Sequence, residues 1–154
     1  MFKFRHNFFI FWFMKGDDVR LVKFQVNFND PETGKTFKAQ ITEAKAKSLV
    51  GVKIGDTVDG KLLGFAGYEF VITGGSDRDG TPMRPDVHGG GRNLVLLSNG
   101  PGFRPKRKGE RRRKRVRGSM ITEDTAQINM KIVKRGKKSL EEIMTSVEKV
   151  SATA

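Results

Sequence analysis

The chain has 154 residues, no cysteine and only two histidines, and its 30 Lys and Arg against 17 Asp and Glu give a formal net charge of +13. This length fits one domain with tails, and the charge favours a polyanionic partner, with nucleic acid ahead of an anionic membrane. The lack of cysteine excludes a disulfide framework, a thiol nucleophile and cysteine-ligated metal, and two histidines leave little for a histidine metal cluster.

The first 18 residues form an aromatic leader. Its apolar run, FFIFWFM over residues 8–14, is too short for a membrane-spanning helix, which needs about 20 residues. A secretory signal is an alternative, but no small-x-small cleavage site follows the run. We expect residues 1–18 to be a misassigned start or a disordered leader, with translation beginning at Met14, Val19, Leu21 or Val22.

The next segment predicts a β-hairpin followed by a short helix. Residues 21–29 alternate between apolar and polar side chains, which is typical of a half-buried strand. Pro and Gly mark a turn over residues 30–35, and the alternation resumes over residues 37–41. Thr42 is a candidate N-cap for a helix over residues 43–49.

Short strands separated by glycines follow. Asp59-Gly60 is a strong signal for a two-residue hairpin within residues 57–63. Residues 68–73 predict another strand, and residues 93–98 (NLVLLS) predict a short buried one.

Residues 74–91 have no periodicity and are dense in Gly, Pro and Asp, so they predict a long loop that is functional or disordered. Residues 126–132 alternate as the last clear strand. Ser139 and Glu142 form a capping box for a C-terminal helix with one apolar stripe. The predicted fold is mainly β: a small β-barrel-like domain with a long basic loop or arm and a short C-terminal helix.

These features divide the chain into five segments. They are the leader 1–18, the β-barrel core 19–101 with its glycine-rich loop 74–91, the basic RNA-binding arm 102–118, the final barrel strands 119–136, and the C-terminal helix and tail 137–154.

The strongest chemical signal is the basic strip, residues 102–118 (GFRPKRKGERRRKRVRG). It holds ten basic residues and a single acid, Glu110, a net charge of +9. The arginine fork matches phosphate geometry, so an Arg-rich run suits RNA. A solvated surface face usually mixes signs, and a polybasic membrane anchor needs a lipidation site or an amphipathic helix beside it. Phe103 is the only aromatic residue of the strip, which favours structured, phosphate-rich RNA over single-strand base stacking. We expect an extended arm that is disordered when free.

Three weaker motifs predict no chemistry. The stretch that ends at Lys61 lacks the Ser or Thr that a phosphate-binding loop needs, because Leu62 follows. Asp77 and Asp79 begin like a calcium loop without its later oxygen ligands, so we interpret them as turn residues that bind backbone amides. His88 has no nucleophile or second histidine near it, so we expect it to contact RNA phosphate or to stabilise the loop. No catalytic residue, metal or cofactor is predicted.

Two blocks of the sequence resemble a known family. Residues 72–83 (ITGGSDRDGTPM) match the pattern aliphatic–small–GG–x–D–x–x–G–x–P–M and continue as RPDVH to His88. The second block is residues 100–118, and the turn DPETGK over residues 30–35 is similar too. On these motifs, the chain resembles, over residues 22–136, the archaeal and eukaryotic-type ribosomal protein six of the small subunit.

The resemblance implies a β-barrel-like body that is a structural constituent of the small ribosomal subunit, binds ribosomal RNA and supports translation in the cytoplasm. Its implied partners are small-subunit ribosomal RNA and neighbouring ribosomal proteins, with no membrane, no small-molecule substrate and no enzymatic activity. The residues alone leave two alternatives: a non-ribosomal RNA-binding assembly or translation factor, and an RNA-processing enzyme whose only candidate residues are Asp77, Asp79, Asp86 and His88.

We expect RNA contacts from the glycine-rich loop and from the basic strip, which would cross RNA helices as an electrostatic clamp. The predicted RNA-binding residues are Arg84, His88, Arg92, Arg104, Lys106, Arg107, Lys108, Arg111, Arg112, Arg113, Lys114, Arg115 and Arg117.

Overall fold

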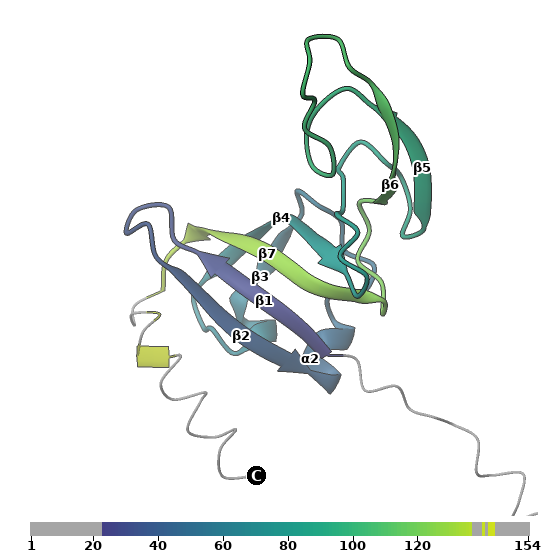
Figure 1. Cartoon of the computed structure of the whole chain (residues 1–154). Helices are drawn as coiled ribbons and strands as arrows, with labels where there is room; N and C mark the ends of the chain where they lie inside the picture. The colour runs from purple at the N-terminus through teal and green to yellow at the C-terminus, as the bar shows by residue number, and fades with distance from the viewer. Residues whose placement is uncertain (1–22, 137–139, 141, 144–154) are drawn as a thin grey trace, which may run out of the picture.

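A computed structural model describes residues 23–136, 140 and 142–143. The leader 1–18 and most of the expected C-terminal helix lie outside these residues. The main elements, in chain order (Figure 1), are β1 (Lys23–Asn29), β2 (Thr36–Thr42), α2 (Glu43–Lys47), β3 (Thr57–Asp59), the 3-10 helix η1 (Gly60–Leu63), β4 (Glu69–Asp77), β5 (Arg92–Leu97), β6 (Arg112–Arg117) and β7 (Thr125–Lys134).

The strands form two separate sheets. The larger has five strands in the order β2-β1-β7-β4-β3, and the smaller pairs β5 with β6. β1 and β7 run parallel, and every other pair is antiparallel. Figure 1 shows the β5–β6 pair projecting away from the larger sheet.

The prediction of a mainly β chain is confirmed, but the expected barrel is wrong. β2 and β3 are the two open edges of the five-stranded sheet. β2 pairs with β1 and the three-residue β3 pairs with β4, and the two edge strands do not pair with each other, so the sheet stays open.

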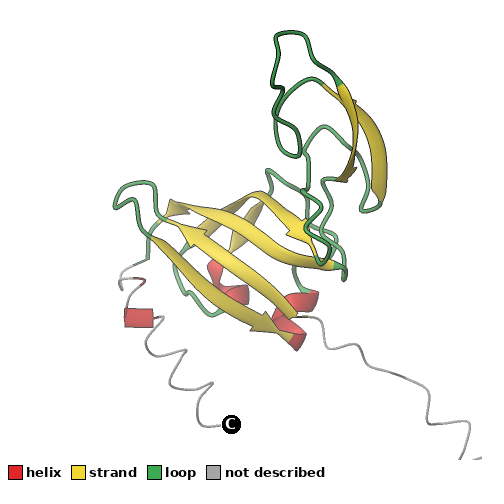
Figure 2. Cartoon of the chain, in the orientation of Figure 1, coloured by secondary structure: helices red, strands yellow, loops and turns green. Residues whose placement is uncertain are grey.

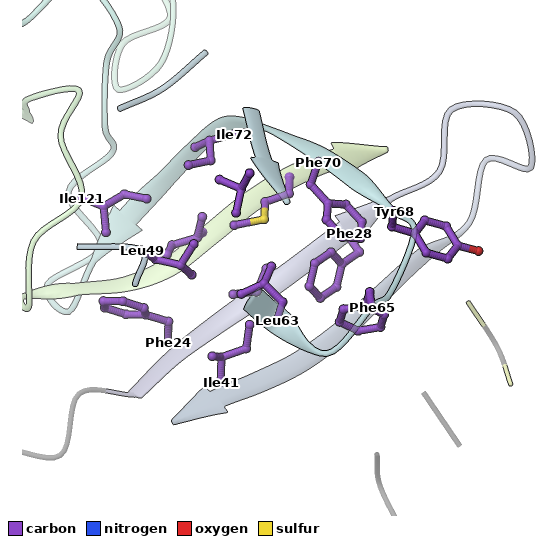
Figure 3. Close-up of a cluster of buried hydrophobic side chains, with 14 of the residues drawn as sticks. Phe24, Phe28, Ile41, Leu49, Leu63, Phe65, Tyr68, Phe70, Ile72 and Ile121 are labelled. Atoms are coloured by element: carbon purple, nitrogen blue, oxygen red, sulfur yellow. The ribbon is translucent and has the colours of Figure 1, made fainter. Parts of the chain in front are cut away.

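The core lies on one face of the five-stranded sheet. Alternation along β1 buries Phe24, Val26 and Phe28. The ring of Phe28 lies 4.8 Å, centroid to centroid, from the rings of both Phe65 and Phe70 (Figure 3), and each such buried ring contributes about 1.5–3 kcal/mol.

Two short helices cover this face (Figure 2). Ala46 of α2 and Leu63 of η1 are buried in the same cluster as the β1 side chains. Leu140 is helical and buried there too, and Ile143 packs against the cluster. The predicted hairpin is confirmed over its described residues, 23–42, and the short helix after it is confirmed as α2.

The predicted two-residue hairpin at Asp59-Gly60 is wrong. Asp59 instead caps η1, its side chain accepting a hydrogen bond from the backbone N–H of Lys61 at 3.0 Å. Gly60 is required by close packing, because a Cβ there would lie 2.3 Å from the carbonyl oxygen of Phe65.

The predicted loop over residues 74–91 begins too early, because β4 continues to Asp77. Gly74 and Gly75 pair with β7 between two register shifts. A Cβ at Gly75 would lie 2.4 Å from the carbonyl oxygen of Gln127, so this glycine permits a close approach between strands.

Two further expectations fail in the smaller sheet. The strand predicted as buried, now β5, exposes Leu94 and Leu96 on the surface. The basic strip is not an extended arm, because residues 112–117 are β6.

Candidate nucleic-acid interface

Residues 92–117, which we call the basic hairpin, carry most of the basic strip on a folded support. β5 and β6 pair residue by residue from Arg92↔Arg117 to Leu97↔Arg112. Because successive strand residues point to opposite faces, Arg112 and Lys114 share a face with Val116, whereas Arg113 and Arg115 share the other face with Arg117.

A small apolar cluster supports the first of these faces. Leu97, Phe103 and Val116 are buried together, with Val87 and Val95 packed against them. Phe103 is therefore a core residue of the hairpin, and its ring is not an open platform for base stacking.

Nine of the ten basic side chains of the basic strip are exposed. They are Arg104, Lys106, Arg107, Lys108, Arg111, Arg112, Arg113, Lys114 and Arg115. A shallow cavity of about 270 Å³ opens among Arg104, Lys106, Arg112 and Lys114. This density of positive charge on a projecting element suits the recognition of a phosphate backbone.

The single acid of the strip shapes the tip of the hairpin. Glu110 accepts a hydrogen bond from the backbone N–H of Lys106 at 2.9 Å and lies 3.4 Å from the guanidinium of Arg112. Its own backbone N–H donates to the carbonyl of Arg107 at 3.2 Å. Glu110 thus closes the turn that displays the cations between residues 106 and 110.

The base of the hairpin is held by one carboxylate, Asp77, at the end of β4. The Asp77 side chain is 0% exposed. It accepts hydrogen bonds from Arg92 at 2.5 and 2.9 Å and from Arg117 at 2.8 Å. Arg92 and Arg117 are the first residue of β5 and the last residue of β6, and they face each other in the register. Asp77 therefore joins both strands of the hairpin to the larger sheet, and we call this triad the Asp77 anchor.

The pKa of Asp77 reflects this environment. Burial raises the pKa, but the hydrogen bonds from Arg92, from the backbone N–H of Asp79 and from Arg117 outweigh it and lower the pKa from its ordinary value of 3.8 to about 2. The carboxyl group is ionised at neutral pH, which balances charge at a crowded basic site.

Arg117 is an internal residue. Its side chain is 4% exposed and donates to Thr122, with Asp124 lying 3.4 Å from the same nitrogen. Its Nε is buried and has no hydrogen-bond partner among the described residues. Arg92 is 38% exposed and also lies 2.6 Å from Asp79.

The loop after β4 packs on the end of β6. Backbone hydrogen bonds join Arg84 to Arg117, and Val87 to Ser119. Gly118 permits this contact, because a Cβ there would lie 1.9 Å from the carbonyl oxygen of Gly89. The loop is thus an ordered part of the hairpin's base.

Arg84 stabilises a second loop instead of facing outward. Its guanidinium donates to the carbonyls of Asn99 and Pro101 at 3.2 and 3.3 Å and to Asp86 at 2.8 Å. His88, in contrast, is exposed.

Of the thirteen residues predicted to bind RNA, nine cations of the basic strip and His88 are exposed. Arg92 is 38% exposed and is paired with Asp77 and Asp79, whereas the side chains of Arg84 and Arg117 are 13% and 4% exposed. All three arginines form hydrogen bonds within the protein. The expectation that Arg117 faces RNA is wrong because its side chain is buried, and RNA contact by Arg84 and Arg92 stays a prediction. Sequence reasoning missed the Asp77 anchor because Asp77 lies 15 and 40 residues from its arginine partners. The turn hydrogen bond expected for Asp77 is present, from the N–H of Asp79 at 2.8 Å.

The candidate residues for RNA-processing chemistry are not arranged for it. Asp77 and Asp79 both bind Arg92, and Asp86 binds Arg84. Among the described residues, no group of three or more His, Cys, Asp or Glu could hold a metal ion. No helix of residues 23–136, 140 and 142–143 combines the length and apolar character that crossing a membrane requires.

Comparison with known proteins confirms the resemblance found in the sequence. The family model for ribosomal protein S6e matches residues 24–145. A small ribosomal subunit protein eS6 of Methanocaldococcus jannaschii is 53% identical over 115 residues, which are 75% of this chain and 86% of the relative. The eS6 protein of Archaeoglobus fulgidus is 48% identical over 128 residues, covering 82% and 99%. That of Methanocella arvoryzae is 39% identical over 134 residues, covering 87% and 94%. The chain therefore belongs to the ribosomal protein S6e family.

Proposed function

We propose that this protein is a structural constituent of the small ribosomal subunit, where it binds ribosomal RNA and supports translation in the cytoplasm. Membership of the S6e family and relatives named as small-subunit proteins support this role. Its partners are then small-subunit ribosomal RNA and neighbouring ribosomal proteins, and its contribution is architectural and not enzymatic.

The observation that carries the proposal is the basic hairpin on its anchor. Nine exposed cations lie on a projection that is fixed at its base by Asp77 and at its tip by Glu110. A preorganised array of charge loses less conformational entropy on binding than a disordered arm. The hairpin can therefore neutralise several phosphates at once from a defined position on the five-stranded sheet.

We infer different roles for the predicted RNA-binding residues. The RNA-binding surface comprises the nine exposed hairpin cations, with His88 at its margin. Arg84, Arg92 and Arg117 position that surface. The two parts of the protein are then a platform, residues 23–91 with 119–136, and a projection, residues 92–118.

The test is incorporation of a charge-reversal variant into ribosomes. Arg111, Arg112 and Arg113 are changed together to Glu, and the matched control changes Lys38, Lys61 and Lys131, which are exposed elsewhere. Mass spectrometry of salt-washed small subunits measures the stoichiometry of each variant, and circular dichroism of the purified chain checks that it folds.

We expect the control in subunits at near wild-type stoichiometry and the hairpin variant to be absent from them. Normal incorporation of the hairpin variant would refute the RNA-binding surface. If the wild-type chain were missing from washed subunits but bound to other RNA, the protein would be a non-ribosomal RNA-binding factor instead.

A further inference from the structure

One face of the basic hairpin combines apolar and basic side chains. In the register of β5 and β6, Leu94 lies opposite Arg115 and Leu96 lies opposite Arg113. Leu94 is 62% exposed and Leu96 is 56% exposed. We call these four residues the mixed face.

The mixed face differs from the rest of the protein surface. Three other large apolar residues are exposed among the described residues, namely Val50, Leu62 and Val133. They come from separate segments, whereas Leu94 and Leu96 are two residues apart on one strand and share a face. Single exposed apolar residues are normal, whereas adjacent ones on one face form a small apolar patch that is a candidate interaction site.

The hairpin's own packing does not explain these leucines. Leu97, Val116 and Phe103 form the small core on the opposite face. Arg113 and Arg115 make no ion pair with another described residue, so their charge is available to a partner. Figure 1 shows the hairpin projecting from the five-stranded sheet, which leaves it accessible.

The chemistry of this face favours a protein partner over RNA. RNA presents phosphates, ribose hydroxyls and the faces of bases, and proteins stack bases on aromatic rings or arginine planes. Leucine offers neither a hydrogen-bond donor nor a π-face. Burial of two leucines is therefore most favourable in free energy against apolar side chains. Arginine beside apolar residues is a typical composition for the centre of a protein–protein interface.

We propose that the mixed face binds a segment of a second protein that carries apolar and acidic side chains. This proposal assigns Arg113 and Arg115 to the protein partner and confines the RNA-binding surface proposed above to the other face of the hairpin and its tip. Apolar side chains of the partner would cover Leu94 and Leu96, while its carboxylates would pair with Arg113 and Arg115. This inference rests on the proposed ribosomal function, since it places the partner beside the protein in the assembled subunit.

The test uses the full chain in assembled small subunits. Leu96 is replaced by the photoreactive residue benzoylphenylalanine, and the control places the same residue at Val133, which is 58% exposed on β7. After salt washing and irradiation, mass spectrometry identifies what is cross-linked. We expect position 96, and not position 133, to cross-link to a protein segment with apolar and acidic residues.

A second variant adds Leu94→Ser beside the probe at position 96. Loss of one apolar contact at an interface centre should lower the cross-link yield about fivefold, whereas Val50→Ser should leave it unchanged. Incorporation is measured first, so absence of the chain from subunits refutes the ribosomal function. If the chain is incorporated, cross-links to RNA alone, to a basic protein segment, or to nothing would overturn the partner proposed here.

Discussion

Replacement of Asp77 by Asn tests the anchor with the smallest change in shape. The substitution removes the negative charge that Arg92 and Arg117 share, and it places an amide donor where two guanidinium groups already donate. The Arg117 side chain is 4% exposed and its Nε has no partner among the described residues, so water cannot easily replace the lost acceptor.

The loss of stability depends on which arginine is left without an acceptor. Removing one partner of a buried ion pair typically costs about 3–5 kcal/mol. Arg92 is partly exposed and keeps Asp79 at 2.6 Å, whereas Arg117 keeps only Thr122 and a distant Asp124. We therefore expect a loss near the lower limit, about 3 kcal/mol, which is a factor of about 100 in the opening equilibrium of the hairpin.

Hydrogen exchange of the amides in β5 and β6 measures this directly, because it reports local opening as well as global unfolding. Protection in the hairpin should fall about 100-fold in the Asp77→Asn variant, and the midpoint of urea unfolding should decrease. The control is Asp79→Asn, because that carboxylate is mostly exposed and such pairs contribute about 0–1 kcal/mol. Hairpin protection within about threefold of wild type, or equal losses in both variants, would refute the anchor.

Three further predictions concern the anchor, the exposed cations and the glycines of β4. Because the pKa of Asp77 is lowered to about 2, its contribution is complete above its ordinary value of 3.8 and is lost as the pH falls towards 2, so hairpin protection should drop in this window in the wild type but not in Asp77→Asn. If the exposed cations bind phosphates, changing Arg112 and Lys114 to Ala should make the slope of log K against log salt shallower by about 1.4–1.8, as measured by RNA titrations at several salt concentrations. Finally, Gly75→Ala should destabilise the protein by about 2 kcal/mol or more in urea unfolding, because the added Cβ meets the Gln127 carbonyl at 2.4 Å, whereas Gly74→Ala, which meets nothing within 4 Å, should change stability little.

Local patterns in the sequence predicted the local elements. The alternation in residues 21–29 specifies β1, since its apolar positions are those buried in the sheet. The same rule placed a strand at β7 and a turn between β1 and β2. These elements need no information from distant residues, because side-chain period and turn composition are sufficient.

The failures come from contacts between distant residues. Gly75 looked like a loop residue, but it is a strand residue that lies against Gln127, 52 positions along the chain. The exposure of Leu94 and Leu96 could not be read from the strand alone, because an unbroken apolar run does not say which sheet the strand joins. Arg92 and Arg117 carry the same charge as their exposed neighbours, and only the position of Asp77 separates their roles.

The basic strip was expected to be disordered because like charges repel and cannot form a core. In the folded hairpin, different residues offset this charge repulsion. Val116 and Phe103 supply a small apolar core, and two acids hold the ends, with Asp77 at the base and Glu110 at the tip. Glu110 lies near Arg112, and Asp77 binds Arg92 and Arg117, but the other exposed cations of the hairpin form no ion pair with a described acid, so the hairpin keeps its positive surface while its conformation is fixed. A folded, strongly charged projection of this kind holds its cations in fixed positions before it meets phosphates. A disordered arm with the same composition would lose more conformational entropy on binding.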